Sequence, residues 1–198
     1  MNEKLKINFR QKQIIMGKLL GDAHLETTNN KTYRLKFEHS FKQKEYVDWL
    51  YEELGDLATS EPKTKQQTVN GKVYQKYWFN TKYSGSFRFY GQQFYAGKKK
   101  VVPKLIKRWL TPICLAVWFM DDGSIKSKQC QAKIFNTQAF DKKDVERLQT
   151  AILQNFQIET QQREQKEGLQ IYVPAKEVEK FRKVIDNHMI DSMRYKLG

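Results

Sequence analysis

The spacing of hydrophobic and polar residues along the chain alternates between a helical period of three to four residues and the period of two that is typical of strands. Helical spacing predicts helices over residues 9–21, 42–54, 86–95, 141–156 and 175–188, and a short helix that ends at Leu110. Strands are expected at residues 23–26, 33–39, 61–69, 72–80, 124–128, 131–136, 158–164 and 169–173, while residues 1–8 resemble a loose arm. The dipeptide Asn70-Gly71 predicts a tight hairpin turn between two of these strands.

The most hydrophobic segment is Leu115–Gly123, which ends in two carboxylates and a glycine. Thr111 and Pro112 suit the N-cap and the first position of a buried helix. Gly123 is expected to end that helix in the left-handed conformation. Asp121 and Asp122 would then face the negative end of the helix dipole, which costs about 0.3–1 kcal/mol per charge. A compensating cation is therefore expected, and a bound metal ion is one candidate.

An earlier segment has the same design. Asn8 is a suitable N-cap for the helix over residues 9–21, and that helix is followed by Asp22. Gly17 and Gly21 lie four residues apart and so share one helix face. Glycine inside a helix costs about 0.5–1 kcal/mol relative to alanine, so we expect another backbone to pack closely against this face.

The order of elements indicates an internal repeat. The pattern α-β-β-α-β-β-α occurs twice, and Asp22 and Asp122 are 100 residues apart. Lys100 follows Asp22 by 78 residues, and Lys196 follows Asp122 by 74. We therefore predict an α+β fold of two pseudo-symmetric halves, residues 1–104 and 105–198, each with its own four-stranded antiparallel sheet.

Charge narrows the functional class. The chain has 36 Lys and Arg residues against 22 Asp and Glu, a net charge of +14. A lysine-biased solvent surface is the simplest interpretation, but an excess this large favours a polyanionic partner. Nucleic acid is preferred to a membrane, because the basic residues are mixed with aromatic residues and glutamines and no apolar run is long enough to span a bilayer.

The start of the chain lacks the apolar core of a signal peptide. Cys114 and Cys130 have no metal-binding spacing, and Cys114 is expected to be a core thiol. These features favour a reducing intracellular compartment.

The carboxylates suggest phosphodiester chemistry. If the two acidic helices pack side by side, Asp22 and Asp122 come close together and repel each other unless divalent cations neutralise them. Mg²⁺ prefers oxygen ligands and is usually completed by water and phosphate. One aspartate with one lysine in each half, Lys100 and Lys196, would make two centres, so that both strands of duplex DNA could be cut.

The strands provide a candidate surface for DNA. A two-stranded ribbon fits the major groove, where polar and basic side chains can read base edges. An ordinary solvent face of an antiparallel sheet is the alternative interpretation. The candidate DNA-binding residues are His24, Glu26, Arg34, Lys36, Glu38, Lys63, Lys65, Gln67, Lys76, Ser124, Lys126, Asn136, Gln138, Gln161 and Arg163.

At this point the sequence resembles a known family. Ile15–Ala23 and Leu115–Gly123 look like the two copies of the motif of single-chain LAGLIDADG homing endonucleases. The yeast mitochondrial omega-intron endonuclease subgroup is the closer resemblance, carried by Leu20–Ala23, Leu110–Pro112, Trp118–Gly123, Asn136–Gln138 and Tyr195–Leu197.

The resemblance implies a monomer with the two motif helices at its centre. It implies Mg²⁺-dependent cleavage of both strands across the minor groove, with Mn²⁺ as a possible substitute, short 3′ overhangs and a role in intron homing. Asp22 and Asp122 would bind metal through their carboxylates, Gly21 and Asp121 mainly through backbone carbonyls, and Lys100 and Lys196 would be the active-site lysines. An organellar matrix or a bacterial cytoplasm is the implied location.

Two other functions stay open. Some members of this family are intron maturases, which assist RNA splicing, so intron RNA is an alternative partner. A DNA-binding regulator that keeps the fold without cutting is the third possibility, although the retained Asp22, Asp122, Lys100 and Lys196 favour the nuclease.

Overall fold

The computed structural model describes residues 4–127 and 129–198, which form two compact units. One unit comprises Met1–Gln11 and Asp22–Gly91, and the other comprises Lys12–Gly21 and Gln92–Gly198. Parts of the predicted arm over residues 1–8 and of the predicted strand over 124–128 fall on residues 1–3 and 128, outside the described residues.

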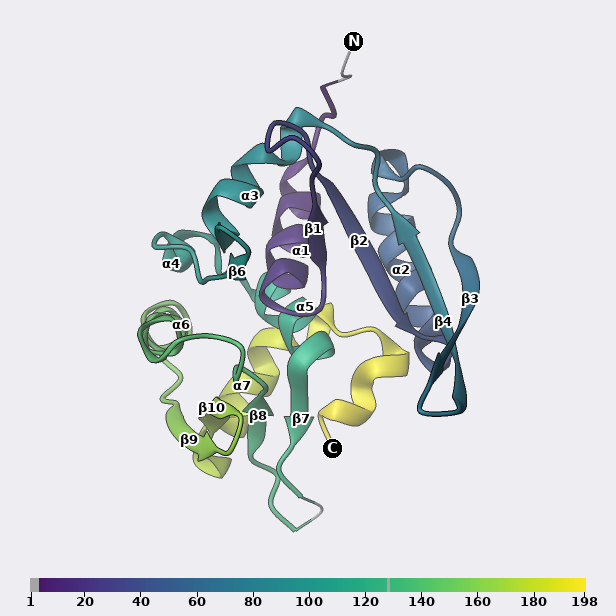
Figure 1. Cartoon of the computed structure of the whole chain (residues 1–198). Helices are drawn as coiled ribbons and strands as arrows, with labels where there is room; N and C mark the ends of the chain where they lie inside the picture. Colours follow the sequence, from purple (N-terminus) through teal and green to yellow (C-terminus); the bar gives the residue numbers. More distant parts are fainter. Residues whose placement is uncertain (1–3, 128) are drawn as a thin grey trace. The chain divides into compact units, whose positions relative to one another are not determined.

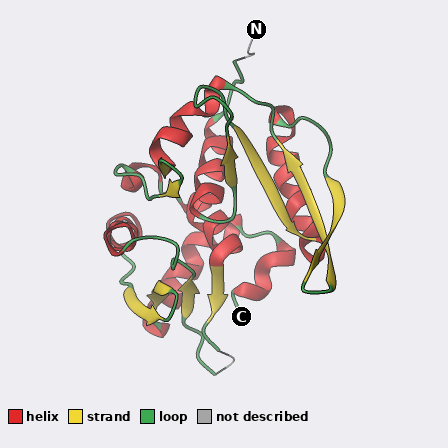
Figure 2. Cartoon of the chain, in the orientation of Figure 1, coloured by secondary structure: helices red, strands yellow, loops and turns green. Residues whose placement is uncertain are grey.

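The first unit is a four-stranded antiparallel sheet with a helix along one face (Figures 1 and 2). The strand order is β1-β2-β4-β3, and the hairpin between β3 and β4 turns at Asn70 and Gly71, whose φ angles are 50° and 74°. These positive φ angles are those of the tight hairpin turn that the Asn-Gly dipeptide predicts. The elements are β1 (His24–Glu26), β2 (Arg34–Ser40), α2 (Lys44–Leu54), β3 (Lys63–Val69), β4 (Lys72–Asn80) and the beginning of α3 (Arg88–Phe94).

Strand β2 shows why this sheet has one apolar face. Leu35 and Phe37 are fully buried, as their alternation predicts, and α2 covers them with Tyr46 and Leu50. His39 continues the same alternation and is also buried, 5% exposed. The opposite face of β2 carries partly exposed charged residues, so it is the polar side of the sheet.

The second unit contains a second sheet of the same topology, ordered β7-β8-β10-β9. The common strand order confirms two four-stranded antiparallel sheets in an α+β fold. The elements of the second unit are most of α1 (Phe9–Leu20), β5 (Tyr95–Ala96), β6 (Lys99–Lys100), α4 (Ile106–Trp109), α5 (Pro112–Asp122), β7 (Gly123–Ile125), β8 (Lys133–Phe135), α6 (Lys142–Phe156), β9 (Gln161–Gln165), β10 (Gly168–Val173) and α7 (Val178–Ile185).

Helices α1 and α5 pack closely within this second unit. A Cβ atom built on Gly17 would lie 2.6 Å from the backbone oxygen of Cys114 and 2.8 Å from Cβ of Val117. A Cβ built on Gly21 would lie 2.5 Å from Cβ of Asp121. All three distances are too short for real side chains, which confirms that the glycines permit close approach of another helix.

The ends of α1 and α5 largely follow the sequence. Asn8 accepts a hydrogen bond from the backbone N–H of Gln11 at 2.9 Å, and the Gln11 side chain accepts one from Asn8 N–H at 3.0 Å, a reciprocal N-cap. Thr111 accepts from Cys114 N–H at 3.3 Å, Pro112 occupies the first turn, and α5 is buried from Ile113 to Met120.

The prediction of a left-handed Gly123 is wrong. Its φ and ψ are −79° and 149°, so α5 continues directly into β7. Glycine fits here for a different reason, because a Cβ at this position would lie 2.1 Å from the ring of Phe119.

Among the described residues, no helix combines the length and the apolar character that crossing a membrane requires. The two compact units differ from the predicted halves 1–104 and 105–198, because most of α1 packs with α5. The halves describe the repeat in sequence, and that division stays a prediction.

Candidate functional site

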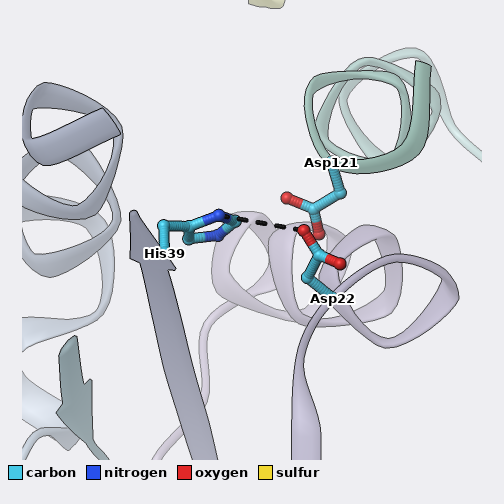
Figure 3. A group of neighbouring side chains, drawn as sticks. All are labelled: Asp22, His39 and Asp121. Carbon is cyan, nitrogen blue, oxygen red and sulfur yellow. Dashed lines mark ion pairs between the residues drawn. The ribbon is translucent and has the colours of Figure 1, made fainter. Parts of the chain in front are cut away.

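The carboxylate of Asp22 and the imidazole ring of His39 face each other in the first unit (Figure 3). Nδ1 of His39 lies 3.8 Å from Oδ2 of Asp22 and 3.1 Å from Oε1 of Gln43. The imidazole packs against the ring of Tyr46 at a centroid distance of 5.1 Å. The Asp22 side chain is 49% exposed, so the pair joins a buried ring to a carboxylate that solvent can reach. Both groups can bind a metal ion or hold a water molecule.

Lys100 lies at the end of the first motif helix. Its Nζ donates a hydrogen bond of 2.5 Å to the backbone oxygen of Gly21, the residue that precedes Asp22 in the chain. An ammonium group at a helix C-terminus satisfies a free carbonyl and opposes the negative end of the dipole. Lys100 is therefore held beside the backbone that carries Asp22.

Lys196 makes the equivalent contact at the end of α5. Its Nζ donates to the backbone oxygens of Met120 at 2.5 Å and Asp121 at 2.8 Å. Lys196 belongs to the 3-10 helix Asp191–Lys196 and is 9% exposed. The correspondence between Lys100 and Lys196, which the sequence predicts from spacing, thus extends to their hydrogen-bond partners.

Lys133 anchors the end of the chain that carries Lys196. It is fully buried in β8 and donates a 2.8 Å hydrogen bond to the backbone oxygen of Leu197. Burial, with the nearby positive charge of Arg182, lowers the pKa of Lys133 from its ordinary value. Lys133 was not among the predicted site residues, because a lysine in an alternating segment is normally assigned to the solvent face.

Asp121 is engaged by Lys18 of α1. The two groups form a 2.6 Å ion pair in which both side chains are fully buried. The Asp121 carboxylate therefore neutralises the buried charge of Lys18. Metal contact mainly through the Asp121 backbone oxygen stays a prediction. Lys18 was not among the predicted site residues, although a lysine inside the apolar run Ile14–Leu20 indicates a buried partner.

Asp122 is fixed through its backbone. Asn136 donates to the Asp122 backbone oxygen from both its backbone N–H and its side-chain amide, each at 3.0 Å. The Asn136 side-chain oxygen in turn accepts from Gln170 Nε2 at 2.8 Å. Asn136, a predicted DNA contact, thus also supports the predicted metal ligand.

The predicted DNA-binding residues of the first half share one face of its sheet. The strand pairing places His24 beside Lys36, Glu26 beside Arg34 and Lys63 beside Trp78, which also pairs with Glu38. By the same register, Lys65, Gln67 and Lys76 lie on this face.

Ion pairs organise the charges on that face. Arg34 contacts Glu26 at 2.6 Å, and Glu38 contacts Lys65 at 2.7 Å and Lys36 at 3.0 Å. Burial opposes ionisation of Glu38, but hydrogen bonds from Lys65 and Lys36 outweigh it and lower its pKa below the ordinary value. The acids therefore hold the cations in place on the sheet.

The second sheet brings together a smaller group of predicted DNA contacts. Ile134 pairs with Ser124 on one side and with Tyr172 on the other, and Tyr172 also pairs with Gln161. These four residues therefore lie across one face of the sheet. Arg163 and Asn136 belong to the same face. Lys126 and Gln138 lie just beyond β7 and β8, and Lys126 sits 5.4 Å from the centre of the Tyr172 ring.

Comparison with known proteins agrees with this architecture. The LAGLIDADG DNA endonuclease family profile matches residues 12–181. The chain is 32% identical over 206 residues to the cytochrome b mRNA maturase bI2 of Saccharomyces cerevisiae, covering 97% of this chain but only 48% of that protein. It is 28% identical over 211 residues to the DNA endonuclease I-ChuI of Chlamydomonas applanata, covering 98% and 97% of the two chains.

A solved structure is similar over nearly the whole chain. The homing endonuclease I-WcaI, bound to its DNA recognition sequence, superposes with a TM-score of 0.92 at 25% identity, covering 98% of this chain and 88% of the other. The family match extends over most of the chain and includes most of α1 and all of α5. The chain therefore belongs to the LAGLIDADG DNA endonuclease family.

Proposed function

We propose that this protein is a site-specific homing endonuclease that hydrolyses both strands of a long duplex DNA target. The cuts would be made across the minor groove and would leave short 3′ overhangs, and cleavage would promote intron homing. The observation that carries the proposal is the matched lysine contact at the two helix ends. Lys100 bonds the carbonyl before Asp22, and Lys196 bonds the carbonyl before Asp122.

The donor groups at these helix ends fit a hard divalent cation. Asp22 and Asp122 offer carboxylates, and Gly21 and Asp121 offer backbone carbonyls, which are the oxygen ligands that Mg²⁺ prefers and Mn²⁺ accepts. When bound, such an ion supplies Lewis acidity that lowers the pKa of water and neutralises charge on the phosphodiester. The carboxylates would orient the ion, and each belongs to one half of the repeat, so each half would act on one strand.

The two lysines have a separate role in this proposal. Their ammonium groups are held at fixed points by backbone carbonyls, so little reorganisation is needed when negative charge develops on the scissile phosphate.

Duplex DNA would be held by the polar faces of the two sheets. The excess of basic residues gives attraction to phosphate, and the polar side chains on both sheets can contact base edges. The chain would act as a monomer, because it carries both copies of the motif. We place it in a reducing compartment, an organellar matrix or a bacterial cytoplasm, where the free thiols of Cys114 and Cys130 remain reduced.

The test begins with selection of cleaved sites from a randomised duplex library in Mg²⁺. The selected target is then used with Asp22→Asn and Asp122→Asn. We expect each variant to retain binding but to nick a single strand, opposite strands for the two variants. The double variant should lose cleavage of both strands by at least about 100-fold, because the charges that hold the ion are removed.

Glu179→Gln is the matched control, because Glu179 is an exposed carboxylate paired with Lys183 on α7. It should cut both strands at the normal rate. Full double-strand cleavage by the Asp22→Asn/Asp122→Asn variant would overturn the assignment of these residues. Failure to select any cleaved duplex would overturn the nuclease proposal itself.

Intron maturation is the second candidate, and the similarity to the bI2 maturase favours it. RNA splicing would use the same basic surfaces without needing the carboxylates. Splicing assistance by Asp22→Asn/Asp122→Asn, with cleavage lost, would separate the two activities in one protein.

A further inference from the structure

His39 is a buried histidine whose nitrogen faces a carboxylate that solvent can reach. It lies on the covered face of β2, between Phe37 and the 3-10 turn Phe41–Gln43. Burial and packing against Tyr46 fix its ring, and the Gln43 side chain lies 3.1 Å from Nδ1. Figure 3 shows the imidazole directed towards Asp22. A histidine held in this way loses little conformational freedom on binding a ligand.

The distance between the two groups suits a shared ion. Donor atoms that each lie about 2.1 Å from one divalent ion cannot be more than about 4.2 Å apart. Nδ1 of His39 and Oδ2 of Asp22 are 3.8 Å apart, so both can contact the same ion without movement of the backbone. The more exposed Asp22 carboxylate leaves this position open to water or phosphate.

Among the described residues, the second half has no histidine at the position equivalent to His39. Strand pairing aligns His24 with Lys36 in one sheet and Ser124 with Ile134 in the other. His39 follows Lys36 at the same offset as Thr137 follows Ile134, so Thr137 is the counterpart of His39. Thr137 is fully buried, and its hydroxyl donates a 2.7 Å hydrogen bond to the backbone oxygen of Leu169. That hydroxyl is committed to the sheet, so the second half offers oxygen ligands from Asp122 and the backbone.

We propose that His39 coordinates the divalent ion of the first half together with Asp22, so that the two metal centres differ chemically. Nδ1 would bind the ion in place of its contact with the Gln43 side chain, which would turn away. The ring proton would reside on Nε2, so the imidazole would bind as the neutral ligand. A nitrogen ligand favours Mn²⁺ or Co²⁺ over Mg²⁺ more strongly than oxygen ligands do. The first centre is therefore the more tolerant of transition metals. This inference rests on the metal dependence of the proposed function.

Pulsed electron paramagnetic resonance of Mn²⁺ tests the inference directly. The full chain, alone and with the selected target duplex, is loaded with Mn²⁺, and the hyperfine coupling of imidazole nitrogen to the ion is recorded. We expect this coupling in the unmodified protein and its loss in His39→Gln. Mn²⁺ affinity should fall about tenfold in His39→Gln, and Mg²⁺ affinity by less.

The other two histidines provide controls. His24→Gln, in β1, and His188→Gln, in the second unit, should both keep the nitrogen coupling. Thermal unfolding of each variant, followed by circular dichroism, verifies that the fold is retained. Thr137→Val tests the second half. Its hydroxyl bonds only the backbone oxygen of Leu169, so its loss should leave the nitrogen coupling unchanged.

The outcomes separate this inference from the proposed function. Bound Mn²⁺ that needs Asp22 but shows no nitrogen coupling would overturn the role of His39 and leave the nuclease proposal intact. Coupling that disappears in His24→Gln or His188→Gln, and not in His39→Gln, would also overturn it. Mn²⁺ that fails to bind, or binds equally well to Asp22→Asn, would count against both proposals.

Discussion

The two copies of the repeat have the same skeleton but differ where their helices meet. Both sheets have the same strand order, and each motif helix ends in a carbonyl that accepts from a lysine. In contrast, Gly17 of α1 faces Val117 of α5, and Gly21 faces Asp121. These are equivalent positions of the two motifs, 100 residues apart.

This difference shows what a single chain can do that a symmetric dimer cannot. Equivalent residues meet each other across the helix interface, so two large side chains there would collide. A dimer of identical chains must place the same small residue on both sides. A single chain can place glycine in one helix and a larger side chain in the other, and can also pair Lys18 with Asp121 across the same interface.

The largest expected effect comes from breaking that ion pair. Lys18→Met leaves the Asp121 carboxylate buried without its cation, which should lower the free energy of unfolding by about 3–5 kcal/mol. Urea unfolding measures this change. Lys12→Met, on an exposed position of the same helix, should stay within about 0.5 kcal/mol of the unmodified protein.

A second substitution tests whether the loss comes from the charge. Lys18→Met/Asp121→Ala removes both charges, so it should lose less stability than Lys18→Met alone, even though a small cavity remains. Equal losses in the two variants would mean that packing of the Lys18 side chain, and not the ion pair, stabilises the interface.

Much of this asymmetric architecture could be predicted from the sequence. The hairpin at Asn70-Gly71, the cap at Thr111, the buried helix α5 and the glycine contacts of α1 all depend on local backbone chemistry or periodicity. Asp22, Asp122, Lys100 and Lys196 were identified from spacing and resemblance. The lysine contacts agree with that pairing, while the catalytic roles of all four stay predictions.

The residues that were missed share a physical cause. Lys18, Lys133 and His39 are polar side chains in buried positions, and each has its partner far away in the sequence or on a neighbouring element. Periodicity assigns such residues either to solvent or to the core and cannot name their partners. The error at Gly123 is similar, because contact with Phe119 and continuation into β7 determine its conformation.

An intermediate effect is expected from filling the gap between the helices. Gly17→Ala places a methyl group within 3 Å of Cys114 and Val117, so the helices must separate, at a cost of about 1–3 kcal/mol. Gly55→Ala is the control. A Cβ at Gly55 would lie at an ordinary 3.6 Å from the Tyr51 ring, and the φ of −62° at Gly55 suits alanine. Thermal unfolding compares the two.

The partner side chain gives the decisive variant. Val117→Ala should recover part of the stability in the Gly17→Ala background, because the opposing side chain becomes smaller. Gly17→Ala with unchanged or raised stability would contradict the inference that small and large residues are matched across this interface.

The smallest expected effects distinguish the two sheets in DNA binding. The polar face of the first sheet carries Arg34 and several lysines, whereas the second offers mainly amides around Arg163. If the first sheet binds mostly through phosphate, Lys63→Ala should reduce the slope of log affinity against log salt by about 1. Gln161→Ala, in β9, should leave that slope unchanged and instead weaken discrimination between target sequences, because amides contact base edges. Fluorescence anisotropy over a range of salt concentrations measures both quantities on the same duplex. Equal changes of slope for the two variants would show that the sheets bind DNA in the same way, despite their different charge.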